Sequence, residues 1–530
     1  MRAAPSPVRP VLTPSAPRPP AIGAVGAVGA LGLALSLSLP LGGSGTARAG
    51  GFEIPANGTE ALGRGGAFTA RADTPLALEY NVGGLGGQRG TRMVFDNNLF
   101  FGQYRYQRAG SDGFGPYPEI SSDGSQPFYA PWFGLSTDFG FFRRITFAVG
   151  AFGPSSVGRR SYPLFVPASD PATGMGGVRP GPGRYDVLAT DLLIVFPTLA
   201  MGIHAHRVLD LGIAVQQVSA VLNLASASYA PLPNNNAPCA ERPEDARCDA
   251  LTRVQVRSFD NFALALGALV HPTPSFDIGV HVRSAVNLGL HPIRAKGTVS
   301  ATTPPALAEL PPLGTERMDA QFETWLPWQF RFGLRYSHKP AGREIFDVEI
   351  DGTYEAWSWN DGSDNKLTLL KPPMLVNRGE PFSILLRHNY RDTFSVRAGG
   401  SYTQPISEQS SLILRLGALV DSSASRDEDL RLDFDTLMKA GATVGLGLYA
   451  RGVTLNIAYA YLHSLPRTVQ SGALVPINGT NGQPLSFNDV PAPGVNGGSY
   501  AGQTHILSIG LSVLFDDLVK GAGWVASHRI

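Results

Sequence analysis

The chain has 530 residues, a formal net charge of +1 at pH 7 and only 16% charged residues. This near-neutral balance gives no electrostatic reason to expect a nucleic-acid partner. A soluble protein of this length usually carries more Lys, Glu, Asp and Arg on its surface. The composition therefore argues against an ordinary soluble multi-domain protein.

Residues 1–49 have the features of a secretory signal peptide. An Arg-containing, Pro-rich start precedes an uncharged apolar stretch at 21–41 and a small-x-small cleavage pattern at 47–49. The Gly and Ser residues that dilute the apolar stretch argue against the alternative, an uncleaved membrane anchor. We predict an exported protein whose mature form starts at Gly50.

Residues 50–90 are rich in Gly and Ala and show neither the period of a helix nor that of a strand. About forty residues are too few to bury a core of their own, so this segment needs a surface supplied by the rest of the chain. We predict that it is an N-terminal hatch inside the ring formed by the strands that follow.

Alternation of apolar and polar residues dominates the chain after residue 90. Phe346, Val348 and Ile350, for example, alternate with Asp347 and Glu349, which is the period of a half-buried strand. The same pattern predicts fourteen strands, at 91–108, 129–140, 144–157, 185–204, 207–230, 253–271, 274–297, 320–338, 342–360, 388–404, 408–421, 436–450, 452–464 and 500–516.

Short turns and long loops alternate strictly between these strands, which is typical of outer-membrane barrels. A soluble β-sandwich, the alternative, has no reason to separate loop lengths in this way. The sequence predicts an all-β protein, a fourteen-stranded antiparallel transmembrane β-barrel over 91–516, with a C-terminal extension at 517–530. The charged face of 346–351 must then line the inside, because the outside faces hydrocarbon.

Tryptophans fall near the ends of several predicted strands. Membrane barrels place aromatic side chains at this level, where the hydrocarbon meets the headgroups. As a set they predict an interfacial aromatic belt, made of Trp132, Trp325, Trp328, Trp357 and Trp359.

No catalytic motif emerges from the sequence. It has no nucleophile elbow, no Gly-Lys-Ser/Thr phosphate loop and no His-Glu-x-x-His pattern. Arg331 and Arg335 face Asp347 and Glu349 across a predicted hairpin, and we interpret these four as an ion-pair ladder of the barrel interior rather than as a catalytic group. We predict that the chain is not an enzyme and holds neither a cofactor nor a metal.

The chain has two cysteines, Cys239 and Cys248, in one short polar segment. Export takes them to a compartment where disulfides form and persist. We predict one disulfide across this loop, since a metal site needs more ligands than the segment offers.

The region after the signal peptide resembles a known family. The sequences GFEIPANGTEALGRGGAFTA at 51–70 and LALEYNVGGLGG at 76–87 are similar to the hatch of FadL-type outer-membrane transporters, which carry long-chain fatty acids and other hydrophobic compounds. Val82 stands in place of a Pro, and Gly83 in place of an Ala, in the Asn-Pro-Ala-Gly-Leu-like signature of that family. Its counterpart here is Asn81, Val82, Gly83, Gly84 and Leu85. Shorter similarities extend the match over most of 50–516.

The resemblance implies a monomeric plugged barrel in the bacterial outer membrane, with residues 81–85 as the hatch and gating group. It also implies an inward kink of the third strand, which would leave a lateral opening in the wall. Gly and Pro within a strand remove ladder bonds and mark such kinks. The candidate residues are Gly150, Phe152, Gly153 and Pro154. The alternative is a simple strand end before a long loop.

An apolar solute needs an apolar path, because exposing it to water costs about 25 cal/mol per Å² of apolar surface. The candidate lining residues in the hatch are Phe52, Ile54, Leu62, Phe68 and Leu78. An outer capture site is predicted in loop 158–184, which carries Tyr162, Leu164, Phe165, Val166 and Met175. A carboxylate ligand would favour a nearby cation, for which the candidates are Arg64, Arg71 and Lys296.

The predicted function is therefore passive uptake of hydrophobic small molecules, with outer-membrane lipid as the surroundings. Fatty acids, alkanes and aromatic compounds all suit an apolar path. Two alternatives are a general porin, which needs no hatch, and a barrel adhesin that uses the long outer loops.

Overall fold

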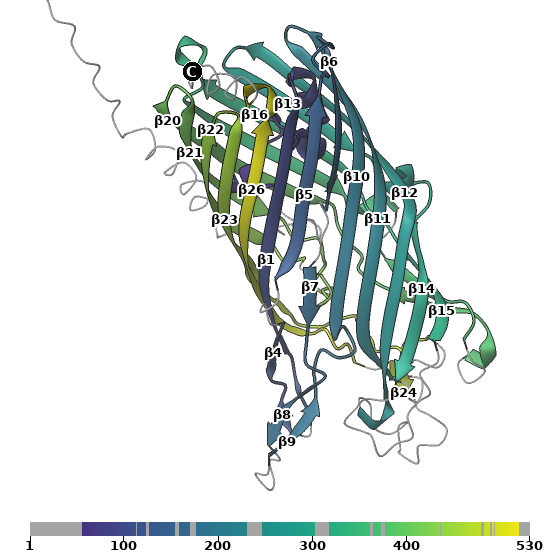
Figure 1. Cartoon of the computed structure of the whole chain (residues 1–530). Coiled ribbons are helices and arrows are strands. Elements are labelled where there is room, and N and C mark those ends of the chain that lie inside the picture. The colour runs from purple at the N-terminus through teal and green to yellow at the C-terminus, as the bar shows by residue number, and fades with distance from the viewer. Residues whose placement is uncertain are drawn as a thin grey trace, which may run out of the picture.

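The computed structural model of the chain is almost entirely β-structure (Figure 1). It describes residues 56–112, 114–122, 127–153, 158–169, 176–229, 246–302, 317–360, 364–372, 377–434, 436–478, 482–487, 490–491 and 493–518. Among these residues, no helix has the length and apolar composition needed to cross a bilayer.

Fourteen antiparallel barrel strands form a closed wall. The wall closes because the first strand pairs with the last along its whole length, from Arg92 opposite Leu514 to Arg108 opposite Gly498. The continuous barrel strands are β1 (Arg92–Arg108), β10 (Ala189–His206), β11 (Leu209–Tyr229), β12 (Asp249–Thr273), β21 (Ser410–Asp421), β22 (Lys439–Ala450), β23 (Val453–Val469) and β26 (Gly498–Leu514).

The remaining barrel strands each consist of two segments. They are β4 (Glu119–Ser122) with β5 (Phe128–Thr137), β6 (Ile145–Phe152) with β7 (Gly158–Ser161), β13 (Phe276–Arg283) with β14 (Ile293–Thr302), β15 (Arg317–Thr324) with β16 (Trp328–His338), β17 (Phe346–Ala356) with β18 (Asn365–Leu369), and β19 (Phe382–Leu386) with β20 (Thr393–Ser407).

Short elements decorate the two ends of the barrel and its interior. Small hairpins pair β2 (Ser111–Asp112) with β3 (Gly115–Pro116), β8 (Phe165–Ser169) with β9 (Gly176–Pro180), and β24 (Ser486–Phe487) with β25 (Val490–Pro491). The helical turns are α2 (Thr59–Gly63), α3 (Ala77–Tyr80), η1 (Val82–Gly87), η2 (Ala246–Cys248), η3 (Val286–Gly289), η5 (Pro340–Gly342), η6 (Trp357–Asn360) and η7 (Asn377–Gly379). The tight turns lie at the upper end in Figure 1 and the long connections at the lower end.

The predicted fold class is confirmed, and all fourteen predicted strands exist. Their continuity is wrong in several places, because 274–297 and 320–338 are each interrupted, and the strands predicted at 144–157 and 342–360 end early, at Phe152 and Ala356. Pro292 and Pro327 lie at two of these breaks, where the missing N–H cannot join a ladder. The last strand ends at Leu514, and residues 515–518 form a helical turn.

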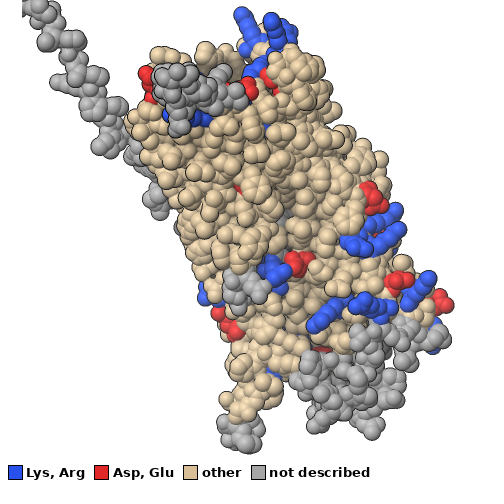
Figure 2. Space-filling model, viewed as in Figure 1, with Lys and Arg blue, Asp and Glu red and all other residues tan. Residues whose placement is uncertain are grey.

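The outer face of the wall carries a wide apolar belt. Leu199, Leu266 and Ile350 point outward and are each half exposed or more. Figure 2 shows this belt as a broad uncharged surface across the middle of the barrel. A surface of this kind is stable when lipid covers it.

The aromatic belt is only partly as predicted. Trp359 is exposed and packs edge-to-face against Trp328, with ring centroids 6.0 Å apart. Trp132 and Trp357 are instead buried inside the barrel, so strand-end position alone did not show which face each residue occupies.

Residues 56–90, which we call the hatch segment, run around the inner wall in close contact with it. Their backbone lies against inward-facing wall glycines, from Gly63 at Gly445 on β22 to Gly86 at Gly202 on β10. Between these two ends, the wall glycines that meet the hatch segment are Gly417, Gly399, Gly333, Gly279, Gly267 and Gly212. A larger residue at such a position would collide with backbone atoms that have no room to move.

We expect Gly212→Val to loosen the hatch segment while leaving the barrel closed. A Cβ at Gly212 would overlap the carbonyl of Val82, and overpacking of this kind costs about 1–3 kcal/mol. Trypsin should therefore cut the hatch segment of the purified, folded variant roughly tenfold faster than that of the wild type, because a cost in this range makes the loosened state correspondingly more populated.

Gly352→Val is the matched control. Gly352 faces outward from β17, and nothing lies within 4 Å of a Cβ added there. Equal cleavage rates in the two variants would contradict the tight fit of hatch backbone to wall.

Candidate functional site

The hatch segment is fixed to the wall by a buried cluster of charges. Asp347 of β17 is fully buried, and its carboxylate accepts hydrogen bonds from three arginines. Its carboxylate lies 2.6 Å from Arg64 Nη2, 3.0 Å from Arg71 Nη1 and 3.0 Å from Arg335 Nε. Two of these arginines belong to the hatch segment and one to β16, so the cluster joins the two parts.

The neighbouring wall carboxylates bind hatch backbone. The N–H groups of Phe68 and Thr69 donate to Asp351 Oδ2 at 2.9 Å each. The N–H of Ala70 donates to Glu349 Oε1 at 2.6 Å. Alternation along β17 places these carboxylates, since every second residue of a strand faces the same side. Asp347, Glu349 and Arg335 thus lie inside the barrel and anchor the hatch segment, whereas the fourth predicted member, Arg331, donates to Gln329 and lies over the ring of Tyr80.

Asn81 has the most polar contacts of the predicted gating group. Its Oδ1 accepts from the N–H of Gly83 at 3.0 Å and so caps η1. Its Nδ2 donates to the carbonyls of Thr69 and Ala268, at 2.9 and 3.0 Å. Asn81 therefore ties two turns of the hatch segment to each other and to β12. Val82 and Leu85 are fully buried.

A continuous apolar cluster joins the hatch segment, the wall and an outer loop. Its hatch members include Phe68, Leu78 and Leu85, and its wall members include Ile194 and Leu222. A small cavity of about 30 Å³ lies within this cluster. It is lined by Leu192, Ile194, Ala220, Leu222, Ile293, Ala295, Phe322, Thr324, Leu326, Asn365 and Phe434. A space of this size holds a water molecule, so a larger solute has to displace side chains.

The predicted lining residues separate into groups. Phe68 and Leu78 belong to this cluster, whereas Leu62 packs in a second one with Leu419 and Ile506. Phe52 and Ile54 lie outside the described residues.

The pairing between β10 and the third barrel strand is interrupted where the predicted kink lies. On β10, Phe196 and Leu192 are four positions apart, yet they pair with Phe152 and Gly158, which are six apart. In the described part of the chain, β7 pairs with β10 and with no strand on its other side. Between these two pairs the third barrel strand therefore has two residues more than β10, and Pro154 lies outside the described residues.

Aromatic rings line the inner side of this interruption. Phe152 stacks between Trp132 and Phe196, at centroid distances of 5.9 and 6.2 Å. The hatch segment contacts the same place, because Asn57 Nδ2 donates to the carbonyl of Gly153 at 3.3 Å. A Cβ at Gly150 would meet Leu78 at 2.6 Å.

Sequence reasoning missed the loop between β21 and β22, residues 422–438, which folds into the mouth of the barrel. Leu430 and Leu432 are buried there, and Phe434 reaches the apolar cluster. Arg431 Nε lies 2.9 Å from Asp186 Oδ1. Residues 431–434 alternate in sequence like a short strand, so the pattern did not indicate that they turn inward.

Charge holds this loop as well as apolar packing. Burial raises the pKa of the Asp186 carboxyl to about 6, although Arg431 beside it favours the charged form. Asp433 is also buried, but His388 and Arg431 bring its pKa down to about 2. His388 Nε2 lies 2.7 Å from Asp433 Oδ2. The outer loop and the turns beside it thus form a second ion-pair cluster.

The predicted outer capture site is largely wrong. Tyr162 and Val166 are buried against Leu430 and Leu432, because loop 422–438 covers them. Leu164 and Phe165 are partly exposed, and Met175 lies outside the described residues.

The candidate cations also differ from expectation. Arg64 and Arg71 are engaged with Asp347, and Lys296 is exposed on the outer face. Arg283, which the sequence did not single out, lies over the ring of Phe196 at 5.2 Å and so borders the apolar cluster.

Cys248 is disulfide-bonded; Cys239, its predicted partner, lies outside the described residues. Within those residues no group of three or more His, Cys, Asp and Glu is placed to hold a metal ion.

We expect Asp347→Asn to release the hatch segment. Removing one member of a buried ion pair costs about 3–5 kcal/mol, because the partner charges stay buried. Amide hydrogen exchange of residues 64–71 should therefore accelerate strongly in the folded barrel. Asp319→Asn, on the exposed outer face of β15, should leave it unchanged. Unaltered protection in Asp347→Asn would contradict the anchoring role.

The fold has known counterparts, although no family model and no curated protein matches the sequence. A FadL homologue from Pseudomonas aeruginosa aligns over 88% of this chain and 100% of its own, with 15% identity and a TM-score of 0.62. The toluene transporter TodX of P. putida aligns over 87% and 99%, with 14% identity and a TM-score of 0.58. The toluene transporter TbuX of Ralstonia pickettii covers 87% and 99%, with 15% identity and a TM-score of 0.57. The chain therefore has the fold of the FadL and TodX type of outer-membrane transporter.

Proposed function

We propose that the chain is a FadL-type protein of the bacterial outer membrane that takes up hydrophobic compounds by passive diffusion, as a monomer and without catalysis. The observation that carries this proposal is the continuous apolar cluster, which extends from the outer loop through the wall to the hatch segment. Similar folds belong to a FadL homologue and to proteins named toluene transporters, which supports the same class of solute.

The apolar lining suits a hydrophobic solute that dissolves poorly in water. Moving about 200 Å² of apolar solute surface out of water is favourable by a free energy of roughly 5 kcal/mol. A water-filled porin offers no such gain, whereas side chains such as Ile194 and Leu222 do. Since the preformed cavity is small, the solute would have to part packed side chains as it moves, so passage requires rearrangement of the interior.

The hatch segment is suited to provide that rearrangement. It is fixed by ion pairs and hydrogen bonds rather than by strand pairing with the wall. We propose that it shifts with the solute and that the solute leaves through the interruption beside Phe152 and Gly153. The stacked rings of Trp132, Phe152 and Phe196 would line this exit. Long-chain fatty acids and monoaromatic compounds both fit such a path.

We expect Leu222→Gln to reduce uptake of a radiolabelled hydrophobic solute about tenfold. An amide placed in the path has to lose its water each time the solute passes, and burying it without a partner costs about 1–3 kcal/mol. Toluene and oleate are suitable probes. The measurement is initial uptake by cells that carry equal amounts of folded barrel at the surface.

Ile506→Gln is the matched control. Ile506 is also buried and faces the interior, but it lies in the second cluster with Leu62. Equal losses in both variants would reject the path. Planar-bilayer conductance tests the porin alternative, since a large, steady open pore in the intact protein would contradict a closed apolar path.

A further inference from the structure

The outer face changes abruptly from apolar to basic on one flank of the barrel. On β12 the outward residues Phe262 and Phe259 are followed, toward the loop end, by Arg257 and Arg253. Figure 2 shows Lys and Arg gathering on this flank, below the uncharged belt. The residues of this basic flank are Arg159, Arg253, Arg257, Arg294, Lys296, Arg317 and Lys366.

Positive charge on the basic flank exceeds the negative charge available to it. Four acidic residues, Asp191, Asp260, Asp319 and Glu323, lie on the same outer face. Arg159 pairs with Asp191 at 3.0 Å, and Arg294 pairs with Glu323 at 3.1 Å. Among the described residues, Arg253, Arg257, Lys296 and Arg317 form no ion pair.

Two of these unpaired cations face each other directly. Arg257 of β12 and Lys296 of β14 are partners in the ladder register, and both side chains are exposed. Like charges opposite one another destabilise a sheet. An anion bound between them would remove this repulsion, and arginine and lysine both bind phosphate through charge-assisted hydrogen bonds.

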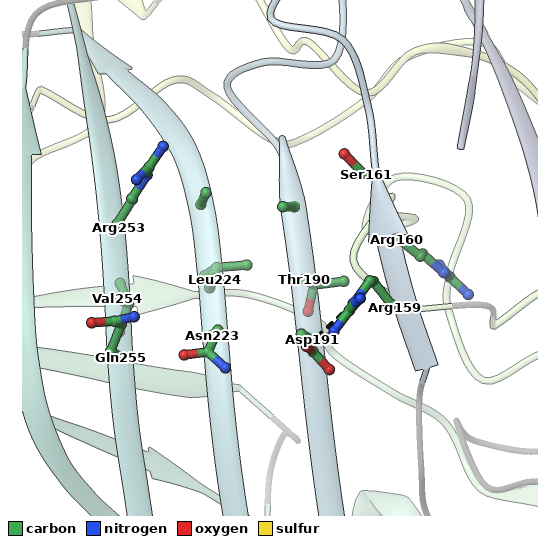
Figure 3. A pocket seen from close by; sticks show the side chains of 12 residues that line it. Arg159, Arg160, Ser161, Thr190, Asp191, Asn223, Leu224, Arg253, Val254 and Gln255 are labelled. Atoms are coloured by element: carbon green, nitrogen blue, oxygen red, sulfur yellow. Dashed lines mark hydrogen bonds and ion pairs between the residues drawn. The ribbon is translucent and has the colours of Figure 1, made fainter. Parts of the chain in front are cut away.

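A hollow next to these residues has the size of a lipid headgroup (Figure 3). It occupies about 590 Å³, within the range of small-molecule sites, and spans β7, β10, β11 and β12. Two rows of paired residues with outward side chains run across these strands and line the hollow, and one row with inward side chains lies between them. The outward rows are Ser161–Ala189–Ala225–Arg253 and Arg159–Asp191–Asn223–Gln255. Two outward rows place the hollow on the outer face, and the small side chains of Ala189 and Ala225 create its depth.

We propose that the basic flank and its hollow bind the phosphorylated headgroup of a membrane lipid. Its position selects a lipid rather than a free anion, because the apolar belt at Phe259 and Phe262 begins directly beside it. Acyl chains can lie along the belt while the phosphate meets Arg257 and Lys296. This proposal concerns the lipid-facing surface and does not depend on what passes through the interior.

The test compares lipids that differ only in phosphate. The purified full-length protein in detergent is titrated with diphosphorylated lipid A and with its phosphate-free form, and binding is followed by native mass spectrometry. We expect the wild type to bind the phosphorylated form at least about tenfold more tightly, as expected for several charge-assisted hydrogen bonds. Arg257→Gln/Lys296→Gln should lose this preference, and Arg257→Lys/Lys296→Arg should keep it.

Arg143→Gln/Arg207→Gln is the matched control, since it removes the same charge from exposed positions at the tight-turn end. It should retain the preference. Equal binding of both lipid forms by the wild type, or an unchanged preference in Arg257→Gln/Lys296→Gln, would overturn the proposal. Full competition by millimolar inorganic phosphate would show that the lipid part is not recognised, and would also overturn it.

Discussion

The position of the hatch segment depends on the pairing of charge inside the barrel. Hydrocarbon outside the wall forces the charged face of β17 inward, and charges in a poorly solvated interior need partners. Asp347 has Arg335 from the wall and Arg64 and Arg71 from the hatch segment. Removing the hatch segment would leave this carboxylate with one guanidinium. The hatch segment is thus part of the charge balance of the wall, and its place is fixed by electrostatics before any gating is considered.

Steric fit and apolar packing then divide the interior. The wall glycines let hatch backbone approach as closely as backbone can, for example Val82 at Gly212 and Arg64 at Gly399. The charge cluster lies on β16 and β17, while the apolar lining lies mainly on β10, β11, β12, β14 and β15. A solute could therefore use the apolar side while the hatch segment keeps a polar anchor. The interruption beside Phe152 adjoins the apolar side, which is where an exit is useful.

The sequence predicted the parts that follow a simple period. Alternation at 346–351 showed correctly that Asp347 and Glu349 face inward, and the same rule located all fourteen strands. It could not show the break at η3, because apolar and polar residues continue to alternate through 274–297. Loop 422–438 was missed because its inward fold depends on distant partners such as Asp186. The wall glycines were also missed, because nothing in the sequence around a strand glycine shows that hatch backbone lies against it.

We propose that the Thr59 end of the hatch segment has to move away from the wall for solute to pass, while the anchor at Asp347 holds. Thr59 Oγ1 lies 2.7 Å from Ser508 Oγ of β26, so Thr59→Cys/Ser508→Cys should form a disulfide that locks one end of it. The decisive measurement is hydrophobic-solute uptake by cells carrying this variant, before and after reduction, with the wild type and Thr59→Cys treated alike. We predict that uptake is lost when the lock is oxidised and returns on reduction. Equal uptake in the oxidised and reduced variant would contradict the account.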